Sequence, residues 1–115
     1  MLQPLQAGDL RGNWATLMLP INADDSIDFA RLADELDALI AAGVDGLYTN
    51  GTAGEFHTQT EAEFDAIQAL VAERCHGAGL PFQIGASHMS AQLSLDRIRR
   101  ARELQWLFTT HSIAT

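Results

Sequence analysis

Residues 43–55 read GVDGLYTNGTAGE, a short apolar run that passes directly into a loop bounded by glycines. Residues 44–50 are typical of a short strand, and residues 51–55 are typical of a turn. Gly43 is placed to end a preceding helix. The segment therefore predicts a helix, a buried strand and a turn in direct succession.

Helical patterns flank this segment on both sides. Residues 29–40 repeat apolar side chains at intervals of three and four, with Ser26 or Asp28 as the N-cap. Thr60 and Glu63 have the spacing of a capping box, and a second apolar helix face follows them. Ser90 can cap a third helix. Its apolar positions are Leu93, Leu95, Ile98, Ala101 and Leu104.

Short apolar runs alternate with these helices, at residues 14–19 and 82–86, with a candidate fourth strand at 106–109. The alternation predicts a parallel sheet with right-handed crossovers. The strand spacing fits the roughly 31 residues per unit of a (β/α)8 TIM barrel of about 250 residues. We therefore predict an α/β fold consisting of the first three βα units of a TIM barrel, with part of the fourth strand. A small open α/β sheet is the alternative. Residues 1–12 are expected to be a lead-in, 13–105 a partial barrel domain and 106–115 a divergent tail.

The composition excludes several classes of function. The formal net charge is -8, so a nucleic-acid-binding role is not expected. No lysine is present, which excludes a Schiff-base lysine or a P-loop lysine from these residues. Cys75 is the only cysteine, so no intrachain disulfide can form. With no signal peptide in residues 1–12 and no long apolar run, we expect a cytoplasmic protein that binds no membrane.

The GVDGL run and the GTAGE loop together resemble the second strand and following loop of the dihydrodipicolinate synthase / N-acetylneuraminate lyase family. That family's pattern is G-V-D-G-L-x-x-x-G-T/S-T-G-E, followed by L-T-x-E-E, and residues 57–63 here stand in the second part. Residues 14–21 resemble the family's first strand, and 82–90 resemble its third strand and loop. The resemblance covers roughly residues 10–105.

The resemblance implies a (β/α)8 barrel and a class I aldolase, a lyase that acts on pyruvate or a related 2-oxo acid. In that family a lysine on the sixth strand forms the Schiff base, and a tyrosine at the end of the fourth strand moves protons. This chain has no lysine, and its only tyrosine, Tyr48, falls on the second strand. No cofactor is implied.

The family's GTTGE loop binds the substrate carboxylate, a role that carries over to Thr52, Ala53 and Gly54. The residues fit this role, because glycines at 51 and 54 would let the backbone approach a ligand and successive N–H groups can form an anion-binding nest. Thr52 adds a hydroxyl donor, whereas Ala53 replaces the second hydroxyl of the pattern. Glu55 is expected to brace the loop.

Thr16, Tyr48, Asn50 and His88 are further candidates for lining a pocket. Packing in the strands is the alternative for Thr16 and Tyr48, and bracing of the loop is the alternative for Asn50. Cys75 is expected to be a buried thiol without a catalytic role. The histidines match no metal motif. Four arginines are expected on one solvated face of the third helix: Arg97, Arg99, Arg100 and Arg102.

The resemblance ends near Gln105, and we therefore expect a truncated or frameshifted N-terminal fragment of such a lyase, inactive alone. The alternatives are a non-catalytic α/β module that binds anions, or the product of a pseudogene without function. The inner strand faces and strand edges of a part-barrel lack their partners. We therefore expect the chain to self-associate.

Overall fold

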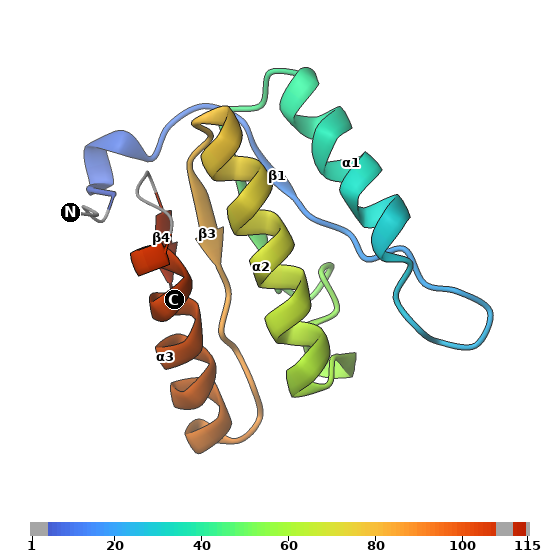
Figure 1. The fold of residues 1–115 in the computed structure, drawn as a ribbon. Coiled ribbons are helices and arrows are strands. Elements are labelled where there is room, and N and C mark those ends of the chain that lie inside the picture. Colours follow the sequence, from blue (N-terminus) through green and yellow to red (C-terminus); the bar gives the residue numbers. More distant parts are fainter. Residues whose placement is uncertain (1–4, 108–111, 115) are drawn as a thin grey trace.

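The computed structural model describes residues 5–107 and 112–114. Strands and helices alternate along the described chain (Figure 1). The strands are β1 (Trp14–Thr16), β2 (Gly46–Thr49), β3 (Phe82–Ile84) and β4 (Ser112–Ala114). The helices are α1 (Phe29–Ala41), α2 (Glu61–Ala78) and α3 (Ala91–Leu107), with short 3-10 turns η1 (Ala7–Asp9) and η2 (Phe56–Thr58).

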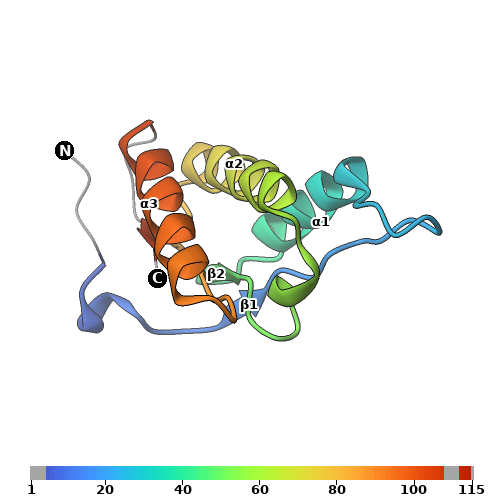
Figure 2. The same cartoon turned by 90° about the horizontal axis from the view of Figure 1, so that it is seen from below.

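The four strands form one parallel sheet in the order β1-β2-β3-β4. All three helices lie on the same side of this sheet (Figure 2). The predicted parallel βα architecture is therefore confirmed.

Local sequence signals account for the ends of the helices. Asp28, one of the two predicted caps, accepts a hydrogen bond from the Arg31 N–H at 3.0 Å. Thr60 and Glu63 form the predicted capping box, with reciprocal bonds of 3.1 and 2.8 Å. Gly79 ends α2 in the left-handed conformation at a φ of 66°.

The predicted fourth strand at 106–109 is wrong in position. Trp106 and Leu107 belong to α3, while residues 108–109 lie outside the described residues. Residues 91–107 contain no glycine or proline. The helix therefore continues through Trp106 and Leu107, where the sequence analysis placed the start of a strand. The strand that follows is β4, which pairs with β3 through Phe82 and Ser112.

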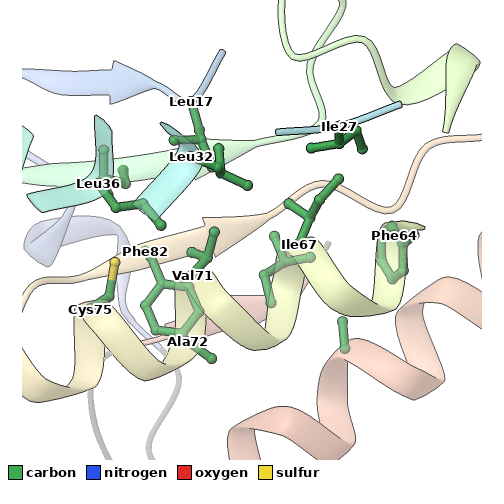
Figure 3. Close-up of a cluster of buried hydrophobic side chains, with 13 residues drawn as sticks. Leu17, Ile27, Leu32, Leu36, Phe64, Ile67, Val71, Ala72, Cys75 and Phe82 are labelled. Carbon is green, nitrogen blue, oxygen red and sulfur yellow. The ribbon is translucent and has the colours of Figure 1, made fainter. Parts of the chain in front are cut away.

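The core lies between the sheet and the helices (Figure 3). Alternate strand residues point into it, because side chains alternate between the faces of a strand. Leu47 and Phe82 are register partners and are both fully buried. The helices supply the other large side chains of the core: Leu32, Leu36, Phe64, Ile67 and Val71.

In the part of the chain that the structure describes, no α-helix lies over the opposite face of the sheet (Figure 2). Thr16 and Tyr48 are register partners, and Tyr48 pairs in turn with Gln83, so the three side chains share this face. Met18 continues the alternation beyond β1 and is 52% exposed. This open face is the side that would face the interior of a complete barrel.

β1 forms one edge of the described sheet, and a helix side chain covers part of that edge. The Met18 N–H donates to the carboxylate of Glu35 on α1 at 3.0 Å. Burial raises the pKa of Glu35. The carboxylate thus satisfies a backbone donor that an edge strand would otherwise leave unpaired.

Candidate functional site

The loop between β2 and α2 lies at the carboxyl end of β2, the end at which barrel enzymes build their sites. Asn50 and Glu55 bound the loop, and both adopt left-handed backbone conformations, at φ values of 61° and 57°. The glycines between them do not have positive φ values. The sharp changes of direction are therefore carried by Asn50 and Glu55.

Gly54 is needed for a reason that the sequence did not indicate. A Cβ at this position would lie 2.9 Å from the backbone nitrogen of Asn50 and 3.2 Å from the carbonyl oxygen of Leu17. The loop therefore packs directly on the backbone of its own strand and of the β1 end. Close packing within the chain is thus a second requirement for glycine at this position, besides the predicted approach of a ligand.

Asn50 connects three segments at the top of the sheet. Its side chain is 2% exposed, and its Nδ2 donates to the Gly85 carbonyl, just beyond β3, at 2.8 Å. Its Oδ1 accepts from Gln59 Nε2 at 2.8 Å, and the same nitrogen reaches the Gly54 carbonyl at 3.2 Å. The structure thus places Asn50 in a bracing network beneath the loop.

Thr52 and Ala53 lie exposed at the tip of the loop. The Glu55 N–H donates to the Thr52 carbonyl at 3.1 Å, which closes the turn between them. A ligand can therefore reach these two residues from solvent, while the network under the loop fixes the backbone that carries them.

Tyr48 extends along the open face of the sheet. A Cβ at Gly51 would lie 3.3 Å from Cε2 of the tyrosine ring, so the ring reaches the first residue of the loop. Tyr48 also lines a shallow cavity of about 220 Å³ with Trp14 and Gln83, towards the other end of the strands. The structure brings Thr16, Tyr48 and the loop to one face.

His88 lies in the loop between β3 and α3, where it contributes to the start of the helix. Its Nδ1 accepts from the Ser90 N–H at 2.9 Å, and its carbonyl accepts from Ser94 Oγ at 3.3 Å. Ser90 Oγ in turn accepts from the Leu93 N–H at 3.3 Å. The imidazole is thereby held by the cap of α3.

Arg97 is the residue that sequence reasoning missed. It was expected on a solvated helix face, but its side chain is 0% exposed, whereas Leu95 and Ile98 are exposed. The buried stripe of α3 includes Arg97 and Ala101, spaced by four. The spacing of four could have indicated that Arg97 lies on the buried face of α3, but a charged residue is normally expected on the solvated face.

Each of the three guanidinium nitrogens of Arg97 donates hydrogen bonds to protein acceptors. The guanidinium binds the Glu61 carboxylate through Nε and Nη2, with a shortest distance of 2.7 Å. It also donates to three carbonyls, those of Phe56, Ser87 and Gln59, at 3.3, 3.1 and 3.3 Å. Its carbon lies 4.9 Å from the centre of the Phe64 ring. Hydrogen bonding from Arg97, with support from Arg100, lowers the pKa of Glu61 to about 2.

A cavity of about 340 Å³ lies between the β1–α1 segment and the end of the loop. The lining residues include three acidic ones, Asp25, Glu55 and Glu63, beside apolar residues such as Leu19 and Ile27. Three carboxylates repel an anionic ligand. The exposed tip at Thr52 and Ala53, which does not line this cavity, is therefore the better candidate for a carboxylate.

Metal ligands and the single thiol are further candidate groups to consider in the described residues. Within residues 5–107 and 112–114, no group of three or more His, Cys, Asp or Glu side chains could hold a metal ion. Burial raises the pKa of the Cys75 thiol to about 12, so the thiolate is scarce at neutral pH. In the same part of the chain, no helix is long and apolar enough to span a membrane.

Comparison with known proteins identifies the family. The model of the dihydrodipicolinate synthetase family matches residues 9–95. The 4-hydroxy-tetrahydrodipicolinate synthase of Thermomicrobium roseum is 39% identical over 95 residues, 83% of this chain and 31% of that protein. The N-acetylneuraminate lyase of Citrobacter koseri is 37% identical over 71 residues, 62% of this chain and 24% of that protein. The chain thus spans about a third or less of these curated relatives.

Solved structures agree with this result. Dihydrodipicolinate synthase of Rhodopseudomonas palustris superposes with a TM-score of 0.79 at 18% identity, covering 99% of this chain and 36% of that one. The enzyme of Bacillus anthracis gives 0.71 at 28% identity, covering 81% and 32%. A prophage protein of Escherichia coli K12 from the same family, solved in complex with pyruvate, gives 0.75 at 24% identity, covering 91% and 34%. The fold described here is that of the first βα units of the TIM barrel of these proteins. Because the family model spans most of the chain and the fold agrees with it, the chain belongs to the dihydrodipicolinate synthetase family.

Proposed function

We propose that the chain supplies the part of a class I aldolase-type lyase that binds the carboxylate of pyruvate or a related 2-oxo acid. The observation that carries the proposal is the GTAGE loop, exposed at Thr52 and Ala53 and braced from beneath by Asn50. Family membership supports the substrate class, and a relative from E. coli K12 was solved with pyruvate.

The chemistry of the loop suits a carboxylate. The N–H groups of Ala53 and Gly54 would act as donors, and the Thr52 hydroxyl would add a third. Hydrogen bonds to an ionised group are stronger than those between neutral groups, so the loop would favour an acid over its neutral amide. Ala53 cannot supply the side-chain donor of the family pattern, and we expect weaker binding as a result.

The Schiff-base amine of the proposed reaction is not among these 115 residues, because the sequence contains no lysine. We therefore propose that the chain by itself binds the acid without turning it over. The comparisons do not favour the two alternatives, an α/β anion-binding module that is no part of a lyase and a pseudogene product. A cytoplasmic location is part of the proposal, and the single, buried Cys75 supports it.

An NMR titration of the ¹⁵N-labelled chain with pyruvate tests the proposal, with pyruvamide as the neutral control. We expect saturable amide shifts concentrated at residues 52–54 with pyruvate, and much smaller shifts with pyruvamide. Equal responses to both compounds, or shifts centred on another part of the chain, would show that the loop is not a carboxylate site.

A further inference from the structure

Two loops meet at the carboxyl ends of β2 and β3, and one side chain from α3 binds both. Arg97 donates to Phe56 and Gln59 in the β2–α2 connection, and to Ser87 in the β3–α3 connection. These acceptors are backbone carbonyls, so the contacts fix the path of the chain and not merely the position of side chains. The guanidinium is suited to this because its donors form a rigid planar fork.

The contacts of Arg97 extend to the candidate loop through Gln59. The Gln59 carbonyl accepts from Arg97, while the Gln59 side chain donates to Asn50 and to the Gly54 carbonyl. Asn50 then donates to Gly85 at the end of β3. A closed set of hydrogen bonds therefore runs from α3 through the loop to the end of β3.

A buried arginine is costly to desolvate unless its charge and its donors are matched. Here Glu61 balances the charge, and its own position at the first residue of α2 fixes it next to the loop. Packing of the guanidinium over Phe64 completes the enclosure. An apolar residue could fill this volume, but it could not bind three carbonyls from two loops.

We infer that Arg97 is a positioning residue, which holds the β2–α2 loop in the geometry that presents Thr52, Ala53 and Gly54 to a ligand. The predicted effect of Arg97 on ligand binding rests on the proposed function, whereas its predicted effect on the order of the loop does not. The hydrogen bonds of Arg97 do not reach the tip of the loop, and it acts through Phe56, Gln59 and Ser87.

Arg100 provides a matched control. It lies on the same helix, donates to the same Glu61 carboxylate at 2.8 Å, and lies 5.6 Å from the centre of the same Phe64 ring. Its other partner is Asp65 on α2, at 2.7 Å. Arg100→Met therefore removes a comparable charge and ion pair without removing a bond from Arg97 to the loops.

The experiment compares amide hydrogen exchange in the unchanged chain, Arg97→Met and Arg100→Met. We expect Arg97→Met to accelerate exchange about tenfold or more in residues 50–59 and 85–88, with much smaller changes in α1. Arg100→Met should leave those loops within about twofold of the unchanged chain. Equal effects of the two substitutions, or unchanged loops in Arg97→Met, would overturn the inference. If Arg97→Met does not fold, Arg97→Lys against Arg100→Lys makes the same comparison, since lysine keeps the charge but not the fork.

The pyruvate titration supplies the second readout. Arg97→Met should weaken pyruvate binding by about tenfold, and Arg100→Met by less than about twofold. Weakening by both variants alike would contradict a specific role for Arg97 in the loop. If the unchanged chain binds no pyruvate at the loop, the proposed function fails, and the exchange data alone then decide whether Arg97 orders the loop.

Discussion

The buried guanidinium of Arg97 forms a hydrogen-bonded ion pair with the partly exposed carboxylate of Glu61, with 2.7 Å between Nη2 and Oε2, although the two residues come from different helices. The pair lowers the pKa of Glu61 from 4.5 to about 2. A carboxyl whose pKa is lower in the folded state stabilises that state above its unfolded pKa. This stabilisation is lost as the pH falls through the folded pKa.

We therefore expect the free energy of unfolding to fall as the pH is lowered from about 4.5 towards 2. Glu61→Gln should reduce this acid dependence, because glutamine does not titrate. Urea unfolding at a series of pH values measures the effect. Asp65→Asn is the control, since it removes only the exposed partner of Arg100 and leaves the Arg97–Glu61 pair intact. An unchanged acid dependence in Glu61→Gln would contradict this assignment.

Two glycines should respond in opposite directions to the same substitution. Gly54→Ala places a methyl group 2.9 Å from the Asn50 nitrogen, and we expect it to destabilise the fold by about 1–3 kcal/mol. Gly77 lies in the last turn of α2, where a Cβ meets nothing within 4 Å. Gly77→Ala should therefore stabilise the fold by about 0.5–1 kcal/mol. Denaturant unfolding of both variants checks the pair, and a neutral Gly54→Ala would show that the loop does not pack as described.

The open face of the sheet leads to a prediction about association. We expect the chain to self-associate, because the inner strand face and the β1 edge lack the partners of a complete barrel. Met18→Lys should reduce association, since a lysine beside an edge strand opposes pairing with another chain. Met89→Lys is the control, because Met89 is 94% exposed and lies in the loop before α3.

Light scattering on the purified chain and on the two variants measures this association. A monodisperse monomer with cooperative thermal unfolding would show that the open sheet is stable alone, and would contradict the expectation. If both variants associate less than the unchanged chain and to the same extent, the added charge reduces association and the β1 edge has no specific role in it.

The isolated chain should form no covalent adduct with pyruvate at a side chain. Borohydride reduction traps a Schiff base, and the sequence has no lysine to form one. Mass spectrometry after proteolysis should find at most an adduct at the N-terminal amine. An adduct on an internal peptide, or turnover of pyruvate by the pure chain, would contradict the proposed absence of activity.

The elements of the fold that depend on local sequence could be predicted. Asp28, the Thr60–Glu63 box and Ser90 begin their helices through bonds to residues three positions away, which a sequence displays directly. The alternation of strands and helices likewise follows from hydrophobic periodicity. The loop at residues 51–55 was found because glycines and hydroxyl residues stand directly after a strand.

The part of the bracing that comes from Arg97 could not be predicted, because it depends on residues distant in sequence. Arg97 contacts Glu61 and Phe56, which lie 36 and 41 positions away, so its burial depends on how α3 packs on α2. The close contact of Gly54 with Leu17 depends on the pairing of β1 with β2. An isolated charge on a helix is usually solvated, and only the tertiary partners of Arg97 reverse that expectation.

Whether the tip of the loop binds a carboxylate can be decided by a single comparison of affinities. This is the dissociation constant of pyruvate for Thr52→Val, compared with that of the unchanged chain and of Ala53→Thr. We predict that Thr52→Val weakens binding by about threefold to tenfold, because one hydrogen-bond donor is lost. Ala53→Thr, which restores the hydroxyl of the family pattern, should tighten binding. Equal dissociation constants for all three proteins would contradict a carboxylate site at Thr52 and Ala53.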